Sequence, residues 1–214
     1  MKGIATVGLD LARNVFQVHA VDGAGSVVIR RQIRRARMQL FFSRLAPCLI
    51  GMEACAGAHC RARELGRFGH EVRLIPPSCV KPFVRRGKTD AADAEAICTA
   101  VTQPAMRFVP VRTEARQAML MSHRTRDFLV RQLTRLANAI RAHLGGSGLV
   151  VPKGVHDMGR LVATAETADL PAEARMPLDL LAGQFNDTKA RIDAMTADLR
   201  RTAEADETAR RLQT

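Results

Sequence analysis

Apolar and polar residues follow one another along the first third of the chain in a way that predicts β-strands. The stretches "IATVGLDLA", "NVFQVHAVD" and "SVVIRRQI" are short, rich in β-formers and separated by turns, which indicates three antiparallel strands. Two later apolar runs, "PCLIGMEA" and "HEVRLIPP", predict a fourth and a fifth strand. Helices are expected over residues 37–45, in "GAHCRARELGRFG" and over residues 90–102. This order predicts an α/β fold with a mixed five-stranded sheet.

Beyond Pro110 the apolar period becomes that of long helices. One stripe recurs at intervals of three and four residues: Leu129, Leu133, Leu136, Ile140 and Leu144. The segment "GGSGLVVPKG" interrupts it, and a heptad-like stripe follows Pro177: Leu181, Phe185, Thr188, Ile192, Met195, Leu199 and Thr202. We therefore expect one domain over residues 1–110 and a helical coiled-coil hairpin over residues 111–214. The hairpin either packs within the chain or joins a second copy to form a homo-oligomer.

The charge of the chain changes what these elements are expected to contact. The 214 residues carry a formal net charge of +12. Residues 1–150 hold 24 lysines and arginines against 10 aspartates and glutamates, whereas residues 151–214 hold 9 against 11. A protein this basic is expected to bind nucleic acid, although a general solubilising charge is the alternative. With no Trp and no Tyr, arginine contacts to phosphates would carry most of the binding.

Five cysteines are spread over the first half of the chain: Cys48, Cys55, Cys60, Cys79 and Cys98. Their odd number and the absence of a signal-peptide pattern predict free thiols in a cytoplasmic protein. The stretch "CAGAHC" offers Cys55, His59 and Cys60 as metal ligands, but no second pair completes a zinc set. We expect these cysteines to be small buried residues. No apolar run reaches 18 residues, so no membrane span is expected.

Four acidic residues lie at the predicted ends of buried strands and at the predicted start of a helix. Asp10 in "VGLDLA" and Glu53 in "LIGMEAC" stand near the ends of buried strands, where a carboxylate needs a partner or a metal. Asp90 and Asp93 in "RRGKTDAADAEAI" are three apart at the start of a helix and share one face. If the first and fourth strands are neighbours, all four acids meet beyond the strand ends, where sites form in α/β sheets.

Four close carboxylates need protons or divalent cations to offset their repulsion. Mg²⁺ prefers oxygen ligands and retains water and phosphate in its coordination shell, and Mn²⁺ is an alternative. Such a site predicts metal-dependent cleavage of phosphodiesters. The plain alternative is that Thr89 or Asp90 caps the helix and that Asp93 favours its dipole.

The order "GLD", "GMEA" and "KTDAADAEAI" resembles the transposases of the insertion sequence 110 family. The stretches "ARELGRFGHEVRLIPPSCVKPFVRRGKTDAADAEAI" and "RDFLVRQLTRLANAIRAHL" also resemble the sequences that are usual in that family. The resemblance implies a DEDD-type, RuvC-like (RNase H-like) domain followed by a coiled coil. It further implies four Mg²⁺-binding catalytic acids, oligomeric assembly, DNA as substrate and a structured guide RNA that specifies the DNA. By position, the four acids would be Asp10, Glu53, Asp90 and Asp93.

Members of that family continue into a second domain that carries a serine nucleophile, whereas this chain stops at "RRLQT". We therefore expect the chain to hold the acid half of a composite site. On this hypothesis it binds nucleic acid and metal but does not complete recombination alone.

Two basic clusters are candidates for binding nucleic acid. Arg85, Arg86 and Lys88 directly precede the paired aspartates and are predicted to hold phosphates of the scissile strand or of the guide RNA. The second cluster, in "RRQIRRAR", contains four candidates: Arg30, Arg31, Arg34 and Arg35. Solvated surface charge is the alternative for this second cluster.

Three other functions remain as alternatives. A stand-alone RuvC-like nuclease or junction resolvase would need only the acid site and a dimer. A sugar-kinase or actin-like ATPase could use "GLDLA" as a phosphate loop, but the further glycine-rich loops of those proteins are missing from the sequence. A non-catalytic fragment would bind DNA or RNA, or pair with a full-length protein as an inhibitor.

Overall fold

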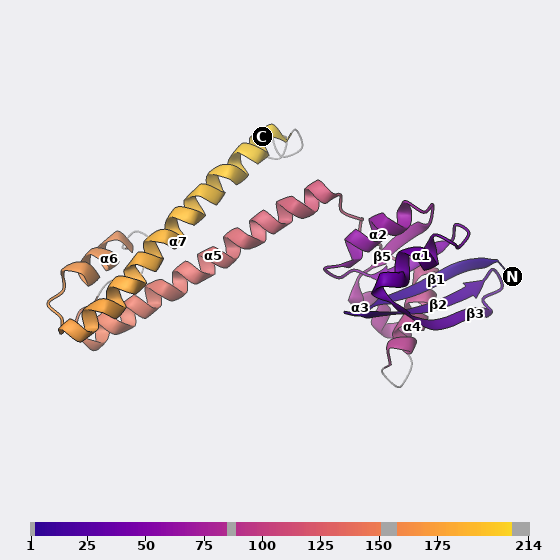
Figure 1. Cartoon of the computed structure of the whole chain (residues 1–214), viewed down its shortest axis with the longest axis horizontal. Helices are drawn as coiled ribbons and strands as arrows, with labels where there is room; N and C mark the ends of the chain where they lie inside the picture. Colours follow the sequence, from indigo (N-terminus) through magenta and orange to yellow (C-terminus); the bar gives the residue numbers. More distant parts are fainter. Residues whose placement is uncertain (1–2, 85–88, 151–157, 207–214) are drawn as a thin grey trace. The chain divides into compact units, whose positions relative to one another are not determined.

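The computed structural model describes residues 3–84, 89–150 and 158–206 (Figure 1). The chain divides into two compact units, Met1–Glu114 and Ala115–Thr214. The first unit contains a sheet and short helices, and the second contains helices. Each unit is described below by itself.

The first unit is built on a sheet of five strands in the order β3-β2-β1-β4-β5. The strands are β1 (Ile4–Leu11), β2 (Val15–Asp22), β3 (Val27–Arg34), β4 (Leu49–Glu53) and β5 (Glu71–Ile75). β2 pairs antiparallel with β1 and β3, while β4 pairs parallel with β1 and β5. The predicted mixed five-stranded sheet is thus confirmed, and its order and directions are consistent with an RNase H-like fold.

One face of the sheet holds the larger apolar core. Val7, Leu9 and Phe16 are fully buried there, because alternate side chains of a strand point to the same face. Two helices supply the facing side chains, α1 (Met38–Phe42) with Met38 and Phe42, and α2 (Ala58–Gly66) with Leu65. The 3-10 turn η1 (Arg35–Arg37) leads from β3 into α1.

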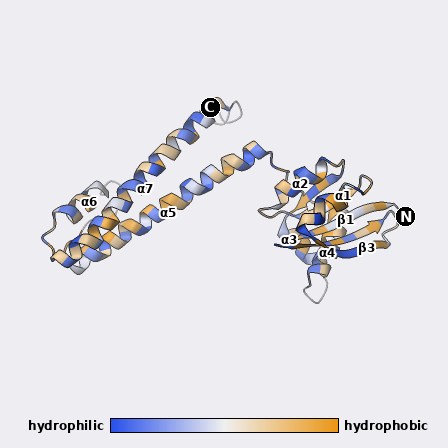
Figure 2. Cartoon of the chain, in the orientation of Figure 1, coloured by the Kyte–Doolittle hydropathy of each residue, from blue (hydrophilic) through white to orange (hydrophobic). Residues whose placement is uncertain are grey.

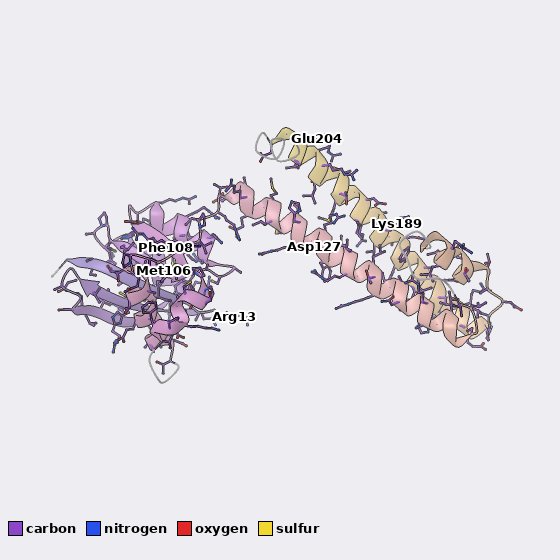
Figure 3. All side chains as sticks on the ribbon, turned by 180° about the vertical axis from the view of Figure 1, so that it is seen from behind. Arg13, Met106, Phe108, Asp127, Lys189 and Glu204 are labelled. Atoms are coloured by element: carbon purple, nitrogen blue, oxygen red, sulfur yellow. The ribbon has the colours of Figure 1, made fainter. Side chains whose placement is uncertain are left out.

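The opposite face of the sheet is covered by α4 (Asp90–Val101). Ile97 and Val101 of α4 pack in a second cluster with Ile75 of β5. Two short elements precede α4, α3 (Pro77–Val80) and η2 (Lys81–Phe83), and Val80 joins the same cluster. Met106 and Phe108, both labelled in Figure 3, pack against it.

Two polar side chains of β2 are buried although their strand alternates in sequence. Gln17 and His19 lie on the face opposite Phe16 and Val18, and α4 contacts β2 on that face. Burial lowers the pKa of His19, which favours the neutral imidazole. The alternation of apolar and polar residues in β2 therefore does not mark a buried and an exposed face. Both faces of the strand are buried, one in the apolar core and the other beneath α4.

Two glycines let α4 approach the sheet closely. Gly8 of β1 is paired with Gly51 of β4 in the parallel ladder. A Cβ atom on Gly8 would overlap the carbonyl oxygen of Ala94 and lie 2.5 Å from the amide nitrogen of Cys98. A Cβ atom on Gly51 would lie 2.7 Å from Cβ of Val101. The backbone of α4 therefore rests directly on β1, and its alanine-rich sequence suits such a contact.

The second unit contains two long helices, α5 (Glu114–Gly146) and α7 (Ala172–Ala205), and a shorter one, α6 (Met158–Thr167). α5 and α7 run antiparallel beside each other (Figure 1). Half of the twelve residues in their predicted stripes are buried: Leu136, Ile140, Leu144, Phe185, Thr188 and Ile192. The others are half-buried, except Thr202, which is exposed. Nε of Arg126 on α5 donates a hydrogen bond of 2.8 Å to Oγ1 of Thr196 on α7.

The start of the second long helix was predicted wrongly. We expected it after Pro177, but α7 begins at Ala172 and contains Pro177. A proline inside a helix removes one backbone hydrogen bond, yet burial of Leu178 and Ala182 offsets that loss. Arg175 also donates to the carbonyl oxygens of Glu166 and Ala168, 2.7 Å each. Helix α6 was not among the predicted elements.

Figure 2 shows apolar residues gathered in the sheet, whereas α5 and α7 mix apolar and polar residues along their length. None of the helices formed by the described residues combines the length and the apolar character that crossing a membrane requires.

Candidate functional site

The sheet brings the strand-end acids to one edge. In the parallel pair of β1 and β4, Gly8 faces Gly51 and Leu9 faces Met52. Asp10 and Glu53 are the next residues of their strands, and each points to the same face as the glycine two positions before it. That face is the one covered by α4. Both acids therefore emerge beside the helix and are half-buried.

The first turn of α4 supplies the other two acids. Thr89 is the N-cap, and its side-chain oxygen accepts a hydrogen bond of 3.3 Å from the amide of Ala92. The cap is thus Thr89, one of the two residues considered for that role, so the Asp90 carboxylate is not used for it. Asp90 is exposed and Asp93 is half-buried. The helix dipole stabilises their negative charges at this position.

Three of the four acids converge on one point. Asp10, Asp90 and Asp93 can each offer a carboxylate oxygen such that these atoms all lie within 4.8 Å of one another. No ion pair joins any of the three to a lysine or arginine of the described residues. Three hard oxygen donors around one point match the ligands that Mg²⁺ and Mn²⁺ prefer. The residues present therefore fit a divalent cation.

The environment of the acids disfavours their charged forms. Burial raises the pKa of Asp10, and the carboxylates of Asp93 and Asp90 raise it further. Burial likewise raises the pKa of Glu53, helped by Asp10 and Asp93. Glu53 lies outside the set of atoms within 4.8 Å but is electrostatically linked to it. A bound cation would relieve the repulsion among all of them.

One basic neighbour was not singled out by the sequence. Lys81 of η2 lowers the pKa of Glu53 against the raising effects of burial and of the other acids. It follows β5, and residues after parallel strands gather at the same edge of a sheet. The position of Lys81 directly after the predicted strand "HEVRLIPP" could therefore have placed it near the acids from the sequence alone.

The pKa shift of Asp10 predicts a stability effect. Because the pKa is raised by folding, the carboxylate costs stability once the pH exceeds its ordinary value of 3.8. In metal-free buffer at pH 7, we expect Asp10→Asn to stabilise the fold by about 1 kcal/mol. Thermal denaturation would register a rise of about 2–4 °C. The difference should shrink as the pH falls toward 4.

The control for this prediction is Asp127→Asn, a change of an exposed acid on α5 (Figure 3). It should leave the melting temperature unchanged at every pH. An Asp10→Asn variant no more stable than wild type at pH 7, or equally stabilised at pH 4, would contradict the electrostatic account.

The structure describes only some of the predicted basic residues. Arg85, Arg86 and Lys88 lie outside the described residues. Arg30 points to the α4 side of β3, where its NH2 atom lies 2.6 Å from Oε2 of Glu95. It therefore links α4 to the edge strand, while the Arg30 side chain stays 55% exposed, and its contact with phosphates stays a prediction.

The other arginines of the second cluster surround the same edge strand. Nε of Arg35 donates a hydrogen bond of 2.8 Å to the carbonyl oxygen of Arg13, and its guanidinium lies 5.0 Å from the ring centre of Phe16. The guanidinium carbon of Arg31 lies 5.6 Å from the ring centre of Phe41. Arg34 is exposed beside them. The cluster thus spreads over both faces of β3.

The cysteine prediction was correct for pairing and partly wrong for burial. All five cysteines are free thiols. Cys48 and Cys98 are buried, but Cys55 and Cys60 are exposed, since they flank the start of α2 on its outer side. Nδ1 of His59 instead accepts a hydrogen bond of 3.2 Å from the amide of Arg112.

The sequence of the chain is similar to those of known transposases. A family model described as "Transposase", for DEDD transposases of the insertion sequence IS110 type, matches residues 7–147. The chain is 44% identical over 202 residues to a "Probable family 20 transposase" of Pseudomonas aeruginosa, covering 94% of this chain and 60% of the relative. It is 37% identical over 214 residues to the "Transposase for insertion sequence element IS1328" of Yersinia enterocolitica, covering 100% and 64%. The chain thus spans less than two thirds of either relative.

Proposed function

The chain belongs to the DEDD transposase family of the insertion sequence IS110 type, and from that premise we propose that it acts in the transposition of an insertion sequence. In this proposal Asp10, Glu53, Asp90 and Asp93 hold Mg²⁺, or Mn²⁺, and act in the cleavage and exchange of DNA strands. The convergence of Asp10, Asp90 and Asp93 within 4.8 Å is the observation that carries it.

In such a site the residues of the chain would have different roles. Asp10 and the first turn of α4 supply carboxylate oxygens from two rigid elements, which fixes the ligands before substrate arrives. Glu53 adds negative charge at the same edge, and Lys81 offers a positive group there. A divalent ion bound here would activate an attacking oxygen and offset charge on a phosphate.

The polyanion partner in this proposal is DNA, together with a structured guide RNA that specifies it, as the family resemblance implies. The net charge of +12 supports both. We further propose a homo-oligomer formed through the helical unit, because Met121 and Phe128 of α5 are 68% and 58% exposed. Free thiols at all five cysteines suit action in the cytoplasm.

The test is a binding and nicking assay with branched and duplex DNA in Mg²⁺, in Mn²⁺ and without metal. We expect salt-sensitive binding in every condition, because arginine–phosphate contacts dominate it. Any nicking that the chain performs should need metal and a cognate guide RNA. Metal-independent nicking would contradict the proposed role of the acids.

The same assay separates the alternatives. Metal-dependent nicking of any branched DNA without RNA would favour a stand-alone RuvC-like nuclease or junction resolvase. Binding of DNA with no cleavage under any condition, unaffected by Asp10→Ala or Asp93→Ala, is the outcome expected of the nucleic-acid-holding half of a composite site, and also of a non-catalytic nucleic-acid-binding protein.

A further inference from the structure

Strand β2 places a polar side chain beside Asp10 that the sequence analysis did not single out. Asp10 of β1 is paired with Gln17 of β2 in the antiparallel ladder. Residues directly opposite each other in such a pair point to the same face of the sheet, with Cβ atoms about 4.5–5.5 Å apart. Glu53 lies on the other side of Asp10, at the end of β4. Three neighbouring strands therefore present Glu53, Asp10 and Gln17 side by side toward α4.

Gln17 is buried without a hydrogen-bond partner for its side-chain amide. Only 7% of the residue is exposed. Within residues 3–84, 89–150 and 158–206, no group donates to its amide oxygen or accepts from its amide nitrogen. Nearly all buried polar groups in folded proteins have such a partner, because a buried amide without one costs stability. The amide of Gln17 is thus placed to take a partner from outside the chain, on the side where it faces Asp10.

The chemistry of the acid site indicates what that partner is. Mg²⁺ gives up its waters reluctantly and keeps several of them when carboxylates hold it. A water bound to a cation through its oxygen can only donate hydrogen bonds, so it needs an acceptor nearby. The amide oxygen of Gln17 is such an acceptor. Unlike a fifth carboxylate, it adds no negative charge to a site where Asp93 and Asp90 already raise the pKa of Asp10.

We propose that Gln17 is a positioning residue of the metal site, whose amide oxygen accepts a hydrogen bond from a water on the divalent cation held by the three converging carboxylates. It holds this water on the β2 side of Asp10, across from Glu53. Groups that support a metal site in this way contribute about 10–100-fold to metal affinity. The inference rests on the proposed function, because it requires the acids to hold a divalent cation.

Titration with Mn²⁺ tests this role through two substitutions of similar size. Gln17→Met replaces the amide with an apolar group of about equal length and should weaken Mn²⁺ binding about 10-fold. Its melting temperature in metal-free buffer should equal or exceed that of wild type, because a buried polar group without a partner is removed. Gln17→Glu keeps an acceptor oxygen and should bind Mn²⁺ at least as tightly as wild type. Its metal-free melting temperature at pH 7 should fall, because it adds a carboxylate beside Asp10.

A role in packing alone predicts the opposite order, with Mn²⁺ affinity kept in Gln17→Met and lost in the less stable Gln17→Glu. The matched control is Gln32→Met on β3. Gln32 is paired with Gln17 on the side away from Asp10 and is exposed. This variant makes the same chemical change one strand further from the acids, so it should bind Mn²⁺ as wild type does.

The role of Gln17 is overturned if Gln17→Met keeps wild-type Mn²⁺ affinity while Asp93→Asn loses it, and the metal site itself then stands. Equal weakening in Gln17→Met and Gln32→Met, or weaker Mn²⁺ binding in Gln17→Glu than in Gln17→Met, overturns it as well. Mn²⁺ affinity that Asp93→Asn leaves unchanged counts instead against the proposed function, and the inference about Gln17 falls with it.

Discussion

Asp93→Asn is expected to weaken divalent-metal binding to the chain by at least about 100-fold. Asp93 is one of three carboxylates whose oxygens lie within 4.8 Å of one another, and it comes from a helix that the sheet holds in place. Replacing it with an amide removes one negative charge from the site and leaves its shape unchanged. Loss of a group that only supports a metal ligand costs about 10–100-fold in affinity, so loss of a ligand should cost no less.

Calorimetric titration with Mn²⁺ measures this effect, and any metal-dependent nicking should fall with it. Asp127→Asn, which makes the same change on the exposed surface of α5, should bind Mn²⁺ as wild type does (Figure 3). DNA binding in the absence of metal should not weaken in Asp93→Asn, since the change makes the chain more positive. Unchanged Mn²⁺ affinity would mean that Asp93 is not a metal ligand and serves only to interact favourably with the helix dipole.

Gly8→Ala is expected to destabilise the first unit by about 3 kcal/mol and to weaken metal binding as well. The added Cβ atom would overlap the carbonyl oxygen of Ala94 and lie 2.5 Å from the amide nitrogen of Cys98. Both atoms are helix backbone, so neither can move without shifting α4. Overpacking of this kind costs about 1–3 kcal/mol, and contact with backbone places Gly8 at the upper end. A displaced α4 would carry Asp90 and Asp93 away from Asp10.

Thermal denaturation and Mn²⁺ titration of the same sample separate the two consequences. Gly23→Ala is the matched control, because nothing lies within 4 Å of the Cβ atom it would add. A melting temperature and a metal affinity equal to those of wild type in Gly8→Ala would contradict the close contact between α4 and β1.

The strands could be predicted because their signals are local. Runs such as "IATVGLDLA" and "HEVRLIPP" carry their own β-forming residues and turns, and all five strands form where they were expected. The proximity of Asp10 to Asp90 and Asp93 is not local. It depends on α4 crossing the sheet directly over Gly8, and nothing in "DAADAEAI" states which strand that helix covers.

Other features escaped because tertiary packing decides them. Pro177 signals the start of a helix, yet burial of Leu178 carries α7 through it. Arg30 reads as part of a basic run, but its partner Glu95 is 65 residues away in the sequence. The roles of the four acids and of the basic residues stay predictions that the geometry supports only for the three carboxylates that converge.

The most direct test of the account is anomalous scattering from crystals of the chain grown with Mn²⁺. The account predicts a manganese peak bound by carboxylate oxygens of Asp10, Asp90 and Asp93, with Glu53 at the same edge of the sheet. Folded chain at saturating Mn²⁺ with no peak there, or with peaks only at other acids, would contradict it.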